Sequence, residues 1–304
     1  MRPVRALLIY TAFVFLGGAL LAPWLFWLAQ STAHTFPNAF GQFFPKLAAN
    51  PFHRYVDRSL LVLALAGLPI LSRGLGAKSW RELGLVKPAG HWRKFLAGLL
   101  LGFVSLALIV GLALLFKARA LDGNLSAALL IKKLLGVAVT ALIVAVVEEI
   151  LFRGGIFGGL RRVFDWRFAL VVSSAIYALV HFLERAELFG PVTWLSGLQL
   201  LPRMLHGFLD VQKLFPGFLN LTLAGALLAL AYRRTGNLWF SIGLHAGWIF
   251  WLKSSGLIAG VAPGVSVAFW GSGKLIDGWL AFLVLLLTLA LSGKFFPVKT
   301  KTTR

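Results

Sequence analysis

Long apolar runs separated by short polar connections dominate this chain, and they limit what it can fold into. The first run covers about residues 6–30, and roughly 20 apolar residues are enough to cross a bilayer as a helix. Hydrophobic residues make up 59% of the 304 residues and charged residues 13%, whereas about 25% of a soluble domain is charged. The sequence therefore predicts an all-α, polytopic membrane helix bundle.

About eight transmembrane helices can be placed along the chain. We expect them at about 6–30, 58–72, 95–116, 134–152, 168–183, 217–232, 238–252 and 277–293. The basic segment 72–94 is typical of an interfacial region, and the proline-containing segment 184–216 is typical of an amphipathic or re-entrant one. Residues 154–167, rich in glycine and arginine, are expected to link the fourth and fifth spans.

The formal charge of +20 has a membrane explanation. Lys and Arg residues gather between the apolar runs, where they follow the positive-inside rule and meet anionic headgroups, so we expect no nucleic acid partner. Their distribution favours both termini in the cytoplasm, and we expect an integral protein of a bacterial plasma membrane. Because the chain has no cysteine, disulfides and thiolate metal sites are excluded.

Two adjacent acids, Glu148 and Glu149, stand inside an apolar run in the stretch VVEEILFRGG. A charged group at bilayer depth costs roughly 2.5–3.5 kcal/mol, so such groups usually face a protected interior or a cavity. Glu149 and Arg153 have i, i+4 spacing and can pair on one helix face. Glu148 points about 100° away and stays free to face elsewhere.

Two histidines, His181 and His245, also lie within apolar runs. If Glu148 faces them, the cluster holds a carboxylate that can act as a general base and two imidazoles that can donate to an oxyanion or ligate a metal. Hydrolysis of a peptide bond needs these groups. A lone histidine in a span is more often a helix–helix hydrogen-bonding group, and the acids alone are also compatible with a structural ion pair.

Three motifs resemble those of the CAAX prenyl protease and bacteriocin-processing family (CPBP family) of intramembrane proteases. EEILFR (148–153) matches the E-E-x-x-x-R signature, YALVH (177–181) is similar to F-x-x-x-H with Tyr177 in place of Phe, and HAGWI (245–249) is similar to H-x-x-x-N with Ile249 in place of Asn. The motifs occur in the family's order on successive spans. The resemblance covers about 130–252 and implies an intramembrane endopeptidase acting on a membrane-attached protein or peptide, CaaX-type by family.

The resemblance also implies roles for the site residues. Glu148, with His181, would activate the attacking water, and His245 would stabilise the oxyanion. Glu149 would support the site and pair with Arg153. Tyr177, one turn before His181, is expected to orient or pack.

The missing Asn and the cofactor leave questions that the sequence does not answer. Ser241, one turn before His245, could replace the hydrogen bond that Ile249 cannot make. Zn²⁺ is a possible cofactor if Glu148, His181 and His245 ligate it, although no H-E-x-x-H pair is present. Metallo-type and glutamic-type chemistry therefore both stay open.

Two other functions fit the same residues. A proteolytically inactive family member could serve as an immunity or scaffold protein, which Ile249 motivates. A transporter or proton relay could also use buried acids and histidines. By sequence we divide the chain into N-terminal helices with interfacial segments (1–129), a catalytic core (130–252), and a C-terminal helix with a basic tail (253–304).

Overall fold

The computed structural model describes residues 2–38, 40–77, 79–122, 125–209 and 214–295. The end of the predicted basic tail, residues 296–304, lies outside these ranges. The chain divides into two compact units, one formed by Met1–Gly76 and Phe182–Val211, the other by Ala77–His181 and Gln212–Arg304. The division at residues 129 and 252 that the sequence suggested stays a prediction.

Nearly all of the regular secondary structure in the described residues is helical, with only two short strands, which confirms the predicted all-α membrane bundle. Four helical stretches are long and apolar enough to span a membrane: Val4–Thr35, Phe52–Gly74, Trp92–Leu115 and Ala127–Leu160. Trp166–His181 and Trp279–Ser292 are shorter apolar helices. The predicted count of about eight spans is therefore not confirmed.

Unit 1 is the unit formed by Met1–Gly76 and Phe182–Val211. Its elements are α1 (Arg2–Ala12), a π-helix (Phe13–Gly17), α2 (Gly18–Thr35), α3 (Phe43–Ala48), α4 (Phe52–Gly74), α9 (Ser196–Met204) and a 3₁₀ turn (Leu205–Phe208). Helix α2 packs against α3, α4 and α9. A Cβ at Gly197 of α9 would lie only 1.9 Å from the Ala19 carbonyl oxygen, so a glycine is needed at this approach. The stretch expected to be amphipathic or re-entrant thus contributes a short helix to this unit.

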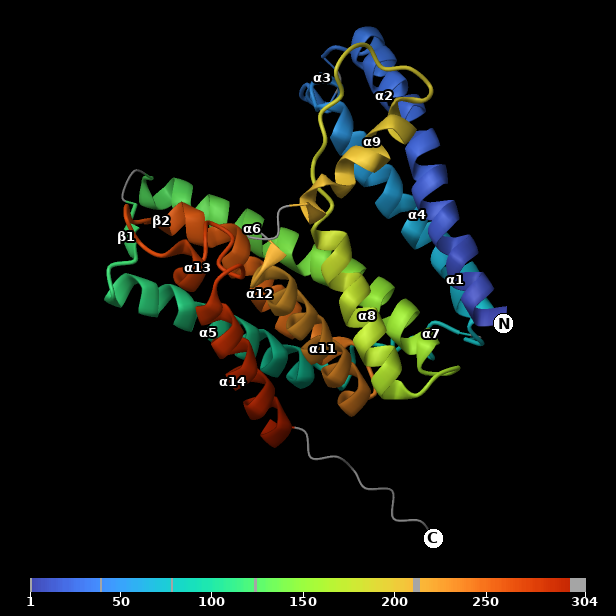
Figure 1. Ribbon diagram of the computed structural model, residues 1–304. Coiled ribbons are helices and arrows are strands. Elements are labelled where there is room, and N and C mark those ends of the chain that lie inside the picture. Colours follow the sequence, from blue (N-terminus) through green and yellow to red (C-terminus); the bar gives the residue numbers. More distant parts are fainter. Residues whose placement is uncertain (1, 39, 78, 123–124, 210–213, 296–304) are drawn as a thin grey trace. The chain divides into compact units, whose positions relative to one another are not determined.

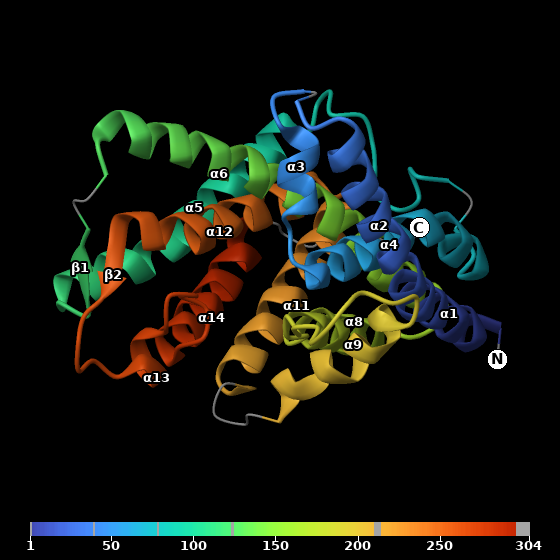
Figure 2. The ribbon, with the colours of Figure 1, turned by 90° about the horizontal axis from the view of Figure 1, so that it is seen from above.

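Unit 2 is the unit formed by Ala77–His181 and Gln212–Arg304. Its elements are α5 (Trp92–Leu115), β1 (Arg119–Leu121), α6 (Ala127–Glu148), a π-helix (Glu149–Phe157), α7 (Gly158–Leu160), α8 (Trp166–His181), α11 (Gly217–Thr235), α12 (Trp239–Ile258), β2 (Ala259–Val261), α13 (Val267–Trp270) and α14 (Trp279–Phe295). The two short strands pair antiparallel, next to the ends of α5 and α12 (Figures 1 and 2).

Helix α12 is the core helix of unit 2. It packs against α5, α6 and α11 (Figure 1), and residues 240–249 are all buried. Polar residues such as His245 on α12 and Asn220 on α11 make these two helices less apolar than a lipid-facing span. Such residues can remain in a buried helix because neighbouring helices protect them from lipid.

Candidate active site

The two acids lie at a junction between two helix types. Glu148 is the last residue of α6, and Glu149 opens the π-helix that runs to Phe157. The sequence predicted a regular helix ending near residue 152 and then a link; the chain instead stays helical to Leu160. Wide π-turns are rare and are frequently found at functional sites, and no residue pattern in the motif announces one.

Glycines on two facing helices fix the position of the helix that carries His245. A Cβ at Gly102 of α5 would lie 2.1 Å from the Leu244 carbonyl oxygen of α12, and one at Gly243 of α12 would lie 2.0 Å from the Phe95 oxygen of α5. Gly98 and Gly247 also approach the facing backbone closely, since their Cβ atoms would lie 2.2 Å and 2.5 Å from its nearest atoms. Small residues four positions apart allow such backbone contact between membrane helices. Because Gly243 and Gly247 flank His245, this contact sets the depth and rotation of the imidazole.

Glu149 is fully buried and holds two cationic or hydrogen-bonding partners. Its Oε1 lies 3.0 Å from Nη1 of Arg153 and 2.9 Å from Nδ1 of His245. Arg153 is 1% exposed, and its guanidinium also stacks on the Tyr177 ring, 4.3 Å from the centroid. A buried charge of this kind is stable only when paired. Glu149 therefore links the motif helix to α12, a contact to His245 that the sequence did not predict.

Glu148 has a different environment from its neighbour. Its side chain is 22% exposed, and its Oε2 lies 3.8 Å from Nε2 of His181 and 3.7 Å from Nε2 of His245. These separations exceed a direct hydrogen bond, and Oε2 has no hydrogen-bond partner in the described structure. Polar atoms at such distances commonly share a bridging water. The carboxylate that the sequence left unpaired thus faces both imidazoles.

The orientation of His181 follows from its own helix. Its Nδ1 lies 2.7 Å from the Tyr177 carbonyl oxygen, which can only accept, so Nδ1 carries a proton. In the neutral ring, Nε2 is then a lone-pair nitrogen, and it is this nitrogen that faces Glu148. The side chain is 31% exposed. Glu148 and His181 can therefore both accept a proton from a molecule placed between them.

Tyr177 contacts three members of the cluster, His181, His245 and Arg153. Its hydroxyl lies 3.3 Å from Nε2 of His245, and the donor depends on the protonation of the imidazole. Its ring lies 4.4 Å from the His181 ring and supports the Arg153 guanidinium. The sequence predicted an orienting or packing residue; what it missed is the hydroxyl contact to His245. The sequence did contain one indication of this contact, because Tyr177 carries a hydroxyl at a position where the resemblance implies Phe.

The position of the missing Asn is apolar and enclosed. Ile249 is 6% exposed on α12. Ser241 does not replace the lost donor, because its buried hydroxyl donates to the Leu238 carbonyl oxygen of its own helix, at 3.0 Å. The Tyr177 hydroxyl is the neutral donor that lies beside His245.

The residues of the cluster do not fit a metal as they lie. One carboxylate and two imidazoles are a ligand set that zinc accepts. However, no group of three or more His, Asp or Glu side chains among the described residues is arranged to hold a metal ion. The metalloprotease interpretation is therefore not supported.

One family model matches the chain. It is the model of the type II CAAX prenyl endopeptidase Rce1-like family, and it covers residues 130–251. This range contains all three motifs and agrees with the extent of the resemblance. No curated protein and no solved structure matches the chain. Residues 130–251, which carry the Glu148, His181 and His245 cluster, thus match the Rce1-like type II CAAX prenyl endopeptidase family, and this match supports the resemblance seen in the three motifs.

Proposed function

We propose that the protein is an intramembrane endopeptidase that hydrolyses a peptide bond of a membrane-attached substrate, with Glu148 as the general base. One observation carries the proposal: Glu148 Oε2 lies within 3.8 Å of two imidazole nitrogens and lacks a direct hydrogen bond, whereas Oε1 of Glu149 beside it is paired with both Arg153 and His245. The protease class of the matched family supports the same reaction.

In the proposed reaction, a water between Glu148 and His181 loses a proton to Glu148 as its oxygen adds to the scissile carbonyl carbon. His181 holds the water through Nε2. The C–N bond then breaks as the proton on Glu148 passes to the departing nitrogen, and the second proton of the former water passes through Nε2 of His181 to the released amine, so that the products are a carboxylate and an ammonium group. Proton transfer by a positioned group of this kind typically contributes about 10²–10⁴-fold.

We assign the oxyanion to His245 and Tyr177. A doubly protonated His245 would have Glu149 on Nδ1 and would present an N–H from Nε2. Two carboxylates and two cations, Glu148, Glu149, Arg153 and His245, would then leave the cluster neutral, which suits a site surrounded by lipid. The Tyr177 hydroxyl would be the second donor, in place of the amide that Ile249 cannot provide.

The matched family and the position of the site among apolar helices support a proposal for the substrate class. We propose a prenylated CaaX-type C-terminus or another membrane-attached peptide, processed at the membrane boundary. We also propose cytoplasmic termini, from the Lys and Arg distribution. Because the chain has no cysteine, a single cysteine placed near either end would report its side of the membrane without background labelling.

Comparative proteomics of membrane extracts tests this proposal in the cell. Cells with the wild-type chain and cells with Glu148→Ala are compared for membrane proteins and peptides with uncleaved C-termini. We expect such termini to accumulate in the variant, at equal amounts of inserted protein. If Glu148→Gln and His245→Ala both leave the phenotype of the protein unchanged, the non-proteolytic scaffold or immunity function replaces the protease.

A further inference from the structure

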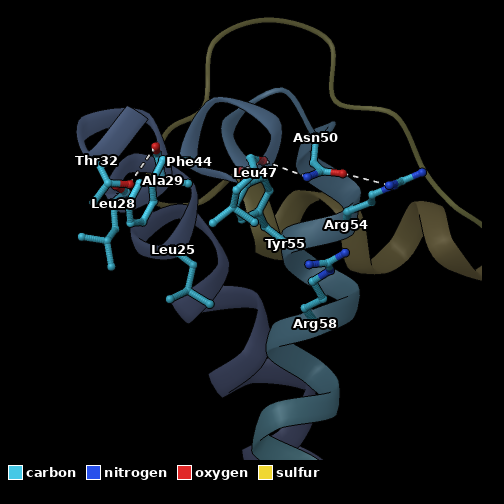
Figure 3. A pocket seen from close by; sticks show the side chains of 10 residues that line it. All are labelled: Leu25, Leu28, Ala29, Thr32, Phe44, Leu47, Asn50, Arg54, Tyr55 and Arg58. Atoms are coloured by element: carbon cyan, nitrogen blue, oxygen red, sulfur yellow. Dashed lines mark hydrogen bonds between the residues drawn. The ribbon is translucent and has the colours of Figure 1, made fainter. Parts of the chain in front are cut away.

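Unit 1 contains a pocket that the proposed chemistry does not use. Helices α2, α3 and α4 enclose it (Figure 3), and its volume is about 240 Å³. Leu25, Leu28, Phe44 and Leu47 form an apolar lining, and the buried Tyr55 closes the floor through a 2.6 Å hydrogen bond to the Leu47 carbonyl oxygen. Pockets that enclose a drug-sized ligand usually measure roughly 300–1,000 Å³, so this one suits a single hydrocarbon chain.

Two arginines stand on the α4 side of this pocket. Arg54 and Arg58 are one helical turn apart, and both line the pocket (Figure 3). Asn50 accepts a hydrogen bond of 2.8 Å from Nη1 of Arg54 and thereby holds that guanidinium in place. Neither guanidinium lies within ion-pair distance of a carboxylate in the part of the chain that the structure describes.

The charge balance around the two arginines is positive. Asp57 is the one acid of α4, and it stands between Arg54 and Arg58 in the sequence of that helix. One carboxylate therefore faces a surplus of cations. This surplus adjoins an apolar surface, because Leu28 is 59% exposed and Phe43 55% exposed at the same end of the unit.

We propose that this pocket binds an anionic phospholipid, with one acyl chain in the apolar lining and the phosphate on Arg54 and Arg58. A free anion would use the arginines and leave the apolar lining exposed. A neutral lipid would fill the lining and leave both charges unpaired. Only a ligand with both parts matches the pocket, and guanidinium groups bind phosphate oxygens through paired hydrogen bonds.

Native mass spectrometry of the full chain, stripped of lipid in detergent, tests this site. The protein is titrated with phosphatidylglycerol and with phosphatidylcholine of the same acyl chains. We expect phosphatidylglycerol to bind at least tenfold more tightly. The double variant Arg54→Gln/Arg58→Gln should weaken phosphatidylglycerol binding by roughly 30-fold, about 2 kcal/mol, and leave phosphatidylcholine unchanged. Arg73→Gln, on α4 but outside the pocket, is the matched control and should change neither.

A second variant tests the apolar half. The Thr32 hydroxyl donates only to carbonyl oxygens of its own helix, at 2.9 and 3.0 Å, so Thr32→Leu keeps the helix and fills space in the pocket. We expect it to weaken both lipids. Equal affinity for the two headgroups, an unchanged affinity in the double variant, or competition by inorganic phosphate as strong as that by phosphatidylglycerol would each overturn the proposal, the last in favour of a soluble anion site.

Discussion

Neutralising each of the two adjacent acids tests the proposed division between a catalytic carboxylate, Glu148, and a structural one, Glu149. In Glu149→Gln, the buried Arg153 and His245 lose the carboxylate that lies 3.0 and 2.9 Å from them. Removing one partner of a buried ion pair typically costs about 3–5 kcal/mol. We take the lower end, because the unfolded chain in a membrane also finds polar partners.

The same change at Glu148 should leave the fold intact. Its side chain is 22% exposed, and its distances to the imidazoles of 3.7 and 3.8 Å are too long for direct hydrogen bonds. We therefore expect Glu148→Gln to change the free energy of unfolding by less than about 0.5 kcal/mol. Removing a general base should lower the rate of cleavage by about 10²–10⁴-fold.

Thermal unfolding of the purified full chain, followed by intrinsic tryptophan fluorescence, measures the change in stability. Cleavage of a prenylated peptide measures the change in rate. Glu149→Gln, at about 3 kcal/mol, should lower the melting temperature by roughly 6–12 °C, at about 2–4 °C per kcal/mol. Glu148→Gln should change it by no more than about 2 °C. Glu187→Gln, at an exposed acid of a connection, is the control. Equal destabilisation by both variants, or a stable Glu149→Gln, would refute the division of roles.

Further predictions concern the packing around His245, the Tyr177 hydroxyl and the metal question. Gly102→Ala would place a Cβ 2.1 Å from the Leu244 carbonyl oxygen, so it should destabilise the chain by about 1–3 kcal/mol and, because His245 moves with α12, reduce cleavage by up to about 10²-fold. The control Gly111→Ala, on the same helix, adds a Cβ with no atom of another helix within 4 Å and should change neither stability nor cleavage. Equal effects of the two substitutions would contradict this role of the glycine contact. Tyr177→Phe should lower kcat by about 10²-fold with little change in KM and a melting temperature within about 2 °C of wild type, whereas an unchanged kcat would assign Tyr177 to packing alone. Treatment with a strong zinc chelator should leave the cleavage rate of the purified chain unchanged; a loss of activity that Zn²⁺ restores, with about one zinc per chain by metal analysis, would favour the metal mechanism instead.

The sequence was sufficient for features that depend on local spacing or on composition. The helical membrane class follows from the apolar runs, and the Glu149–Arg153 pair follows from the i, i+4 spacing. The sequence could not establish that the motifs on three separate helices converge in space. Their relative rotation depends on how α12 packs against α5 and α6.

Other features depend on tertiary contacts that leave no clear pattern in one sequence. The π-helix after Glu148, the contact of Glu149 with His245, and the hydroxyl of Tyr177 beside that imidazole belong to this group. The contact between the glycine pairs Gly98/Gly102 and Gly243/Gly247 was also not predicted, because it depends on how two helices far apart in the sequence pack. The count of spans was the weakest prediction, because a buried helix and a lipid-facing helix look similar in a hydropathy scan.

The central claim is that Glu148 activates water for peptide hydrolysis. Its most direct test is the single-turnover cleavage rate of a prenylated CaaX peptide by purified wild-type and Glu148→Gln chains, at matched amounts of folded protein. The account predicts cleavage by the wild type and a rate at least 10²-fold lower for the variant. Cleavage by Glu148→Gln at the wild-type rate would contradict it.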